Sequence, residues 1–290
     1  MKKLKLALPK GSLQEATVEI FRKAGIRIYP GERSYFPVCD DEELEIMLIR
    51  AQEIAKYIED GVFDAGLTGH DWICETGAKV TDICELIYAK SGFRPVRWVQ
   101  AVPKGSPIRS AKQLQGKRLA TELVNVVKKY LAKNKVKAEV LFSWGATEAK
   151  APILVDAIVE LTETGSSLRA NNLEIIDEVL SSSTRFIANR QAMDEAWKKK
   201  KIESLAILLK GALAAEGMVG LKMNLEEKNI AQIMGILPAL KKPTISRLTI
   251  PGWIALEVII EEKIVKKIIP ELKRAGAEGI IEYPLNKIIY

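Results

Sequence analysis

The feature that most constrains the fold is an alternation of two hydrophobic periods along residues 4–161. Segments with apolar residues at every second position, or in short apolar runs, alternate with segments whose apolar residues recur every three or four positions. Strands alternating with helices predict an α/β protein with mostly parallel sheets covered on both faces. We expect strands over 4–8, 43–49, 63–69, 96–103, 116–122, 136–142 and 155–161, and helices from 12, over 50–61 and over 124–134.

The pattern changes after about residue 212. The expected order becomes strand 218–225, helix 226–236, strands 243–250 and 254–260, helix 263–277 and strand 279–285. This βαββαβ order is that of a ferredoxin-like module, and such modules bind amino acids or pair with copies of themselves. A length of 290 residues leaves room for two or three domains in all.

Composition excludes several classes of protein. No segment approaches the roughly 20 apolar residues of a membrane helix, and the N-terminal apolar run is too short for a signal peptide, so we expect no membrane and a cytoplasmic protein. One histidine, His70, excludes multi-histidine metal sites. The net charge of +7 is spread along the chain, and aromatics are only 6%, which argues against nucleic acid as a partner. A modest positive excess suits a small polyanionic substrate.

The stretch TETGSS, at 162–167, follows the apolar strand that begins after Asp156. A glycine in a tight strand-to-helix turn lets successive backbone N–H groups point at an anion, and Thr164, Ser166 and Ser167 add hydroxyl donors. This pattern predicts a site for a phosphate monoester. The nearby carboxylates would repel phosphate unless they bind ribose hydroxyls or hold Mg²⁺ through water. The alternative is an ordinary helix N-cap rich in serine and threonine.

Three other stretches fall where parallel strands end, which is where open α/β sheets bind ligands. PKGS places Lys10 and Gly11 in a second strand-to-helix turn, with Ser12 and Glu15 in a capping-box pattern. LTGHD carries Gly69 and Asp71, and TEL carries Thr121 and Glu122. Arg50 opens a helix, where the helix dipole disfavours a cation, and this conflict suggests an external anion. Each of these stretches can also be an ordinary turn, and His70 an ordinary structural or surface residue.

Five segments together resemble the ATP phosphoribosyltransferase family, in its long form. They are LALPKGSL, FDAGLTGHDWI, RLATEL, GATEAKAP and DAIVELTETGSSLRANNL, in the order of the family's own blocks. The last is the most specific of them. The C-terminal module, with LPALKKPTISRL, resembles the regulatory domain of the long form. The resemblance therefore covers the whole chain.

The resemblance implies a two-lobed catalytic part of the type II periplasmic-binding-protein fold, followed by a ferredoxin-like, ACT-like regulatory domain. Lobe I would comprise 1–90 and 181–212, lobe II 91–180 and the regulatory domain 213–290. The family transfers the phosphoribosyl group of phosphoribosyl pyrophosphate to N1 of ATP in the first step of histidine biosynthesis. It uses Mg²⁺, is inhibited by histidine and in the long form is typically a hexamer, with a dimer as the alternative state.

Residue roles follow from the same resemblance. The loop would hold the 5-phosphate of the donor, and the strand before it would contribute two carboxylates: Asp156, Glu160, Glu163, Thr164, Gly165, Ser166 and Ser167. The other blocks would line the cleft that binds ATP: Lys10, Gly11, Ser12, Arg50, Gly69, Asp71, Thr121 and Glu122. The motif associated with histidine binding matches at Leu240 and Thr244.

Two positions depart from the family pattern. The first block often reads PKGRL, so Ser12 stands where an arginine is usual, and Arg50 is the candidate to supply the lost phosphate contact. Leu123 and Val124 replace the usual aromatic–proline pair, which leaves the contact to the adenine ring open.

The implied reaction suits a chain with one histidine, because adenine N1 carries no proton that a base must remove. Two other functions stay open at this stage. Residues 183–186, followed by a small βαββαβ domain, also resemble prephenate dehydratase. An amino-acid sensor built on the same lobes is the non-enzyme alternative. Neither explains the TETGSS loop.

Overall fold

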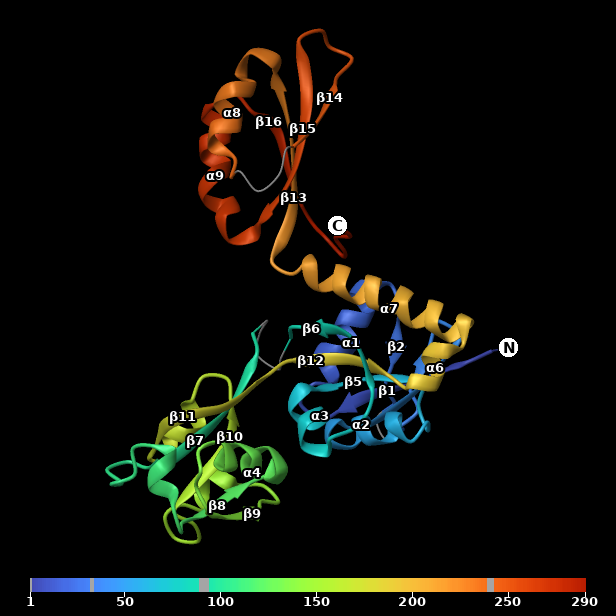
Figure 1. Cartoon of the computed structure of the whole chain (residues 1–290). Helices are drawn as coiled ribbons and strands as arrows, with labels where there is room; N and C mark the ends of the chain where they lie inside the picture. Colours follow the sequence, from blue (N-terminus) through green and yellow to red (C-terminus); the bar gives the residue numbers. More distant parts are fainter. Residues whose placement is uncertain (1, 32–33, 89–93, 239–242) are drawn as a thin grey trace. The chain divides into compact units, whose positions relative to one another are not determined.

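The chain forms two compact units, Met1–Ala206 and Ile207–Tyr290, described separately below (Figure 1). The computed structural model describes residues 2–31, 34–88, 94–238 and 243–290. Within these ranges no helix is long and apolar enough to cross a membrane.

The first unit contains a five-stranded sheet of order β4-β1-β5-β12-β6. β1 pairs in parallel with β4 and β5, while β12 runs antiparallel to β5 and β6. Its strands are β1 (Leu4–Lys10), β4 (Leu44–Arg50), β5 (Ala65–Gly69), β6 (Thr81–Leu86) and β12 (Thr184–Ala188). Its helices are α1 (Gln14–Ala24), α2 (Ala51–Glu59), α3 (His70–Thr76) and α6 (Arg190–Asp194), and a short hairpin comprises β2 (Ile28–Tyr29) and β3 (Val38–Cys39).

A second five-stranded sheet of the same unit has the order β11-β7-β10-β8-β9. β8 pairs in parallel with β9 and β10, and β7 runs antiparallel to β10 and β11. Its strands are β7 (Val96–Pro103), β8 (Arg118–Thr121), β9 (Glu139–Phe142), β10 (Ala157–Thr162) and β11 (Leu173–Ser182). The associated helices are η1 (Ala111–Leu114), α4 (Val124–Lys133), η2 (Thr147–Ala149) and α5 (Ser166–Ala170).

In each sheet four of the five strands run in the same direction, which confirms the expectation of mostly parallel sheets, and one strand in each is reversed. The reversed strands are β12 in the first sheet and β7 in the second, and each is the first strand after a passage of the chain between the sheets, from β11 to β12 and from β6 to β7. Only Ser183 separates β11 from β12. Because β11 and β12 belong to different sheets, this single residue carries the chain from one sheet to the other.

The central strand β1 also differs from its sequence pattern. Its leucines alternate with lysines in the sequence, yet Leu6, Ala7 and Leu8 are all fully buried. Helices cover both faces of a central strand in this class of sheet, and Ala7 packs with Ile54 and Ile58 of α2. The two ends of the strand are where its polar residues reach solvent.

The second unit has the predicted βαββαβ order. Its four antiparallel strands lie in the order β14-β15-β13-β16, and α8 and α9 lie on one face (Figure 1). Alternate residues of β13 and β15, such as Leu221 and Leu256, form a core with Val265 and Leu272 of α9. The elements are β13 (Met218–Glu226), η3 (Glu227–Asn229), α8 (Ile230–Ile236), β14 (Thr244–Arg247), β15 (Trp253–Glu261), α9 (Glu262–Arg274) and β16 (Glu278–Pro284), after α7 (Ala196–Ala214), which runs into this unit.

Candidate active site

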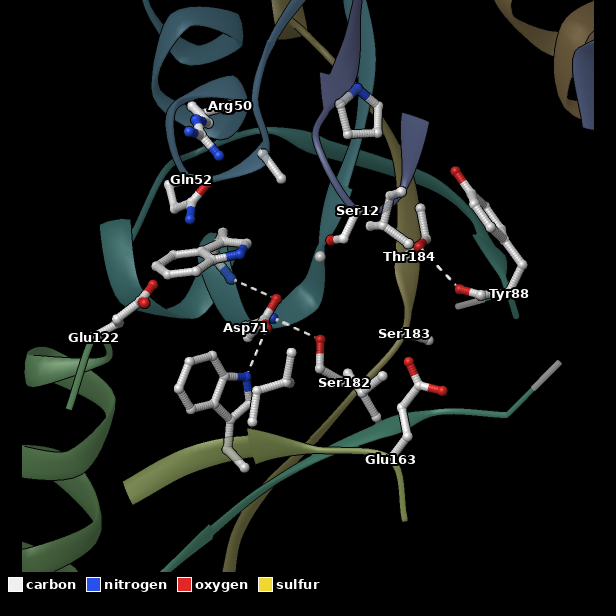
Figure 2. Close-up of a pocket in the computed structure, with 18 of the residues that line it drawn as sticks. Ser12, Arg50, Gln52, Asp71, Tyr88, Glu122, Glu163, Ser182, Ser183 and Thr184 are labelled. Atoms are coloured by element: carbon white, nitrogen blue, oxygen red, sulfur yellow. Dashed lines mark hydrogen bonds between the residues drawn. The ribbon is translucent and has the colours of Figure 1, made fainter. Parts of the chain in front are cut away.

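A cavity of about 210 Å³ in the first unit is lined by residues from both five-stranded sheets (Figure 2). All four predicted strand-end stretches contribute residues to the lining of this cavity. The TETGSS stretch contributes only Glu163. The predicted site residues that line it are Lys10, Ser12, Arg50, Gly69, Asp71, Glu122, Glu160 and Glu163. The structure thus brings together side chains that are more than 150 residues apart in the sequence.

The first sheet contributes the cations. Lys10 ends β1 and Arg50 ends the neighbouring β4, in direct register with each other. Gly11 follows with φ of +109°, and a Cβ built there would lie 3.6 Å from Nη1 of Arg50. The Lys10 ammonium lies 3.7 Å from the ring centroid of Tyr35. The turn after β1 therefore places two cations beside a stretch of backbone that a ligand can approach closely.

The predicted capping box at Ser12 is wrong. Helix α1 begins at Gln14, its N-cap is Leu13, and no side chain caps it. Ser12 instead lines the cavity, where its hydroxyl is available to a ligand (Figure 2). A local preference that the structure does not use is expected where a residue serves a site.

Asp71 is the most buried carboxylate of the cavity, with 4% of its surface exposed. One of its oxygens accepts a 2.6 Å hydrogen bond from Nε1 of Trp98, on the other sheet, and the second accepts from the backbone N–H of Trp72. Its own N–H donates to Oγ of Ser182 (Figure 2). Burial raises the pKa of this carboxyl, although these donors oppose the shift. Gly69 is required beside it, since a Cβ there would lie 2.0 Å from Oδ1 of Asp71.

The TETGSS loop lies between β10 and α5. Gly165 has φ of +75°, and its N–H donates to Oγ1 of Thr162 at 2.7 Å. Thr164 donates to the hydroxyl of Ser166, and Ser167 donates to the carboxylate of Glu148. Helix α5 has only five residues, so its dipole is smaller than the sequence suggested. Hydroxyls and backbone N–H groups are the donors of this loop, and its residues 164–167 are not among those that line the cavity.

Three glutamates face the cavity from the second sheet. Glu160 is on β10, Glu163 begins the loop and Glu122 follows β8. Burial raises the pKa of Glu160, and the nearby carboxylates of Glu148 and Glu122 act in the same direction. Among the described residues no cluster of three or more histidines, cysteines or carboxylates could hold a metal ion by itself.

Asp156 and Thr121 lie elsewhere. Asp156 precedes β10, at the end of the strand opposite the loop, and its carboxylate accepts from the N–H of Arg118 and from Lys117. Strand polarity is the reason, because a residue that begins a strand cannot reach the carboxyl end of the sheet. Thr121 is buried and accepts from the N–H of Leu123, so it shapes the turn before Glu122 without lining the cavity.

Sequence reasoning missed several cavity residues. The unpredicted members include Gln52, Trp72, Tyr88, Trp98, Ser182, Ser183 and Thr184. The serines and Thr184 come from the passage between the two sheets, a segment that is not among the expected strands. Nothing local distinguishes Trp98 from any aromatic residue of a buried strand.

The predicted regulatory residues lie in the second unit. Thr244 is the first residue of β14 and is exposed. Leu240 lies outside the described residues.

Comparison with known proteins identifies the family. A family model for ATP phosphoribosyltransferase (HisG) matches residues 50–211, and a model for the C-terminal domain of HisG matches residues 215–287. The ATP phosphoribosyltransferase of Chlorobium luteolum is 59% identical over 288 residues, which cover 99% of this chain and 98% of that protein. The chain belongs to the ATP phosphoribosyltransferase family. The ATP phosphoribosyltransferase of Thermodesulfovibrio yellowstonii is 57% identical over 288 residues, which cover 99% of each chain.

Membership of the ATP phosphoribosyltransferase family makes the chain a transferase of histidine biosynthesis and rules out the dehydratase and sensor alternatives. A solved chain from the ATP phosphoribosyltransferase (HisG:HisZ) complex of Thermotoga maritima matches with a TM-score of 0.61 and 29% identity. The match covers 96% of that chain but 71% of this one. The expected α/β fold with a separate C-terminal domain is confirmed.

Proposed function

We propose that the chain joins phosphoribosyl pyrophosphate to N1 of the ATP adenine and releases pyrophosphate, with Mg²⁺ as cofactor and histidine as inhibitor. One observation carries the proposal beyond the family name. A glycine loop rich in hydroxyls adjoins a cavity whose opposite side carries two cations. The hydroxyl-rich loop suits the phosphate of a ribose phosphate, and the two cations suit a pyrophosphate or triphosphate chain.

The loop is the proposed site of the donor 5-phosphate. Thr164, Ser166 and Ser167 offer hydroxyls, and Gly165 permits the tight turn that places them between β10 and α5. Glu160 and Glu163 lie between the loop and the cavity and would accept hydrogen bonds from the ribose hydroxyls. Asp156 has no part in the proposal, since Lys117 and Arg118 already bind its carboxylate.

The first-sheet side is the proposed site of the polyphosphate groups and of ATP. Lys10 and Arg50 would bind phosphate oxygens, while Gly11, Ser12 and Gly69 would allow close approach of the backbone. Arg50 takes the place of the arginine that the family usually has at position 12. Asp71 and Glu122 line the same space and suit hydroxyl or amine donors of the nucleoside, while Thr121 supports the turn before Glu122.

Mg²⁺ binds proteins through one or two carboxylates together with substrate phosphates, and Glu122, Glu160 and Glu163 offer that donor set. When bound, Mg²⁺ would neutralise negative charge on the pyrophosphate leaving group. Because N1 of adenine has a free lone pair, the chain needs no general base. Its residues align two polyanions and stabilise the leaving group, and alignment alone can contribute about 7–11 kcal/mol.

The remaining assignments rest on the family. Lobe I at 1–90 and 181–212, lobe II at 91–180 and a regulatory domain at 213–290 are the proposed divisions, with Leu240 and Thr244 at the histidine site. A hexamer is the proposed assembly, with a dimer as the alternative. The cytoplasm, where both substrates are made, is the proposed compartment.

An ultraviolet assay with ATP, phosphoribosyl pyrophosphate and Mg²⁺ tests the proposal, with pyrophosphatase added to pull the reaction forward. Alkylation at N1 changes the adenine chromophore, so product is measured directly. We expect turnover that EDTA abolishes and histidine inhibits. Turnover without an effect of histidine would reject the regulatory assignment alone, while no turnover and no thermal stabilisation by the donor would reject the proposed reaction.

A further inference from the structure

Ser183 is a cavity residue whose hydroxyl proton is bound to a carboxylate. It is the single residue between β11 and β12, and 7% of its surface is exposed. Its Oγ donates to Oε1 of Glu85 at 2.5 Å, since an ionised carboxylate can only accept. The backbone carbonyl of Ser183 accepts from the N–H of His70 at 2.9 Å. Hydrogen bonds therefore fix both the main chain and the side chain of this residue.

Arg185 holds Glu85 in place for this interaction. The two residues lie directly opposite each other in the antiparallel pair of β6 and β12. Nη2 of Arg185 donates to the same Oε1 at 3.2 Å, and its Nη1 donates to Asp82 at 3.4 Å. Ser183 precedes Arg185 by two residues, the spacing that puts side chains on one face of a strand. The ion pair thus keeps the Glu85 carboxylate within reach of the Ser183 hydroxyl.

The Ser183 hydroxyl can offer a ligand an acceptor but no donor. A hydroxyl has one proton and two lone pairs, and the proton goes to Glu85. The lone pairs stay available to a donor that enters the cavity. The neighbouring Ser182 is the reverse case, because its Oγ accepts from the N–H of Asp71 at 3.0 Å and its own proton is not needed for that bond (Figure 2). Two adjacent serines therefore present opposite hydrogen-bonding character.

The position of Ser183 indicates which ligand group it meets. The proposed reaction joins a substrate on the first-sheet side to one on the second-sheet side, so the reacting atoms meet where the two sheets adjoin. Ser183 lines the cavity at the residue that connects those sheets. The 6-amino group of adenine is on the carbon next to N1, so it arrives there together with N1. Leu13, Tyr88 and Val96 line the same cavity and offer apolar surface to a purine ring.

We propose that Ser183 determines specificity for adenine by accepting a hydrogen bond from its 6-amino group, and that Glu85 is the positioning residue that makes this hydroxyl an acceptor. This inference rests on the proposed function. A 6-oxo purine, as in ITP, presents an oxygen where ATP presents the amino group, so two acceptors would face each other without a proton between them. The site would thus exclude nucleotides whose N1 carries a proton and cannot attack the ribosyl donor.

The test compares KM for ATP with the Ki values of two nucleotides that compete with it. ITP carries the 6-oxo group, and purine riboside triphosphate carries only hydrogen at that carbon. In Ser183→Ala we expect KM for ATP to rise about 10-fold and Ki for purine riboside triphosphate to stay unchanged. Ki for ITP should fall, because the opposing acceptor is gone, and KM for phosphoribosyl pyrophosphate should not change. A smaller folded fraction of the variant would lower the rate but would not alter KM or Ki.

Glu85→Gln tests the positioning role. The amide can donate to Oγ of Ser183, which frees the hydroxyl proton for the 6-oxo group of ITP. The ratio of Ki for ITP to KM for ATP should therefore fall about 10-fold. Asp82→Asn is the matched control, because it removes the same charge beside Arg185 and leaves the hydrogen bond between Glu85 and Ser183 in place. It should keep the wild-type ratio.

Three results would overturn the inference. The ratio could stay unchanged in Ser183→Ala and Glu85→Gln, or it could shift equally in Asp82→Asn, which would assign the effect to charge alone. The loss in Ser183→Ala could also fall on KM for phosphoribosyl pyrophosphate, and the acceptor would then bind a ribose hydroxyl of the donor. Absence of transfer to ATP by the wild-type enzyme would instead reject the proposed function. In that case the melting shifts that ATP and ITP produce in the same variants would still test recognition of adenine.

Discussion

The two sides of the cavity are built from the same kind of turn but carry different chemistry. After β1, the turn presents Lys10 and Gly11 beside Arg50, so its contribution is positive charge. After β10, the turn presents hydroxyls and glutamates around Gly165 and has one cation, Arg169, which donates to a carbonyl of the loop itself. Charge attracts any polyanion, whereas fixed hydroxyls and carboxylates discriminate by geometry. We therefore expect the turn after β1 to determine the affinity for polyanions and the turn after β10 to determine recognition of the ribose phosphate.

The largest effect is expected at Gly165. Gly165→Val places a β-branched residue at φ of +75°, with its Cβ only 2.9 Å from Nη1 of Arg169. The Arg169 side chain must move away, and the positive φ disfavours valine, so the loop shifts; misplacement of a site by about 1 Å can cost about 100-fold in rate. We expect kcat/KM for the donor to fall by about that factor or more, measured by the ultraviolet assay.

Gly105→Val is the matched control, since Gly105 has φ of +82° and nothing within 4 Å of an added Cβ. It carries similar backbone strain outside the cavity. Wild-type affinity for the donor in Gly165→Val would contradict the assignment of the loop.

Removal of a cation should have the next largest effect. Arg50→Met loses charge-assisted hydrogen bonds to phosphate, worth roughly 1.5–3 kcal/mol, so we expect KM for the substrates to rise about 10-fold to 100-fold. Steady-state kinetics at two salt concentrations would measure the change.

Ser12 offers a way to sharpen this result. Ser12 and Arg50 line the same cavity. Adding Ser12→Arg to Arg50→Met should therefore recover much of the substrate affinity that Arg50→Met loses. If the added arginine does nothing, the idea that Arg50 replaces the usual family residue is wrong.

Asp71 links the two sides and should affect stability. Asp71→Asn keeps one acceptor for two donors, the indole of Trp98 and the N–H of Trp72, and should cost about 1–3 kcal/mol of unfolding free energy. Burial raises the pKa of Asp71, so the folded state binds the proton more tightly than the unfolded state. The contribution of this group to stability therefore falls as the pH rises from the ordinary value of 3.8 through the raised pKa.

Urea unfolding of the wild type and of Asp71→Asn between about pH 4.5 and pH 8 measures this pH dependence of stability. The difference in unfolding free energy, wild type minus Asp71→Asn, should shrink as the pH rises. A difference that is constant with pH would show that Asp71 does not titrate in this way.

The smallest effect is expected at Thr164. Thr164→Val removes a hydroxyl that donates to Ser166, while Thr164→Ser keeps it. One neutral hydrogen bond contributes about 0.5–1.5 kcal/mol, so we expect KM for the donor to rise about 2-fold to 10-fold in the valine variant only. Equal effects in both variants would assign the loss to packing.

The sequence was sufficient for the longer periodic strands and helices, because such segments determine their own type, but it did not predict β6, β11 or β12. It also located the strand-end turns, since glycines and hydroxyls follow apolar runs there. Asp156 could have been excluded by strand polarity alone, because it begins β10 and the cavity lies at the other end.

Other features depend on contacts between distant segments. The Trp98–Asp71 hydrogen bond joins residues on different sheets, and the mixed strand directions arise where the chain passes between those sheets. No local pattern encodes either. The capping box predicted at Ser12 was wrong for the opposite reason, since its local pattern was strong but the helix begins two residues later.

The paired indoles in the cavity give the protein a built-in optical reporter. The rings of Trp72 and Trp98 have centroids 6.1 Å apart and planes at 88°, and both line the cavity. Two chromophores held this close in one orientation contribute a near-ultraviolet circular dichroism band that depends on their mutual angle. Trp144 is 92% exposed and packs edge-to-face against Phe142, outside the cavity. Titration with either substrate can therefore be followed without a label, by the ellipticity of the enzyme's own tryptophans.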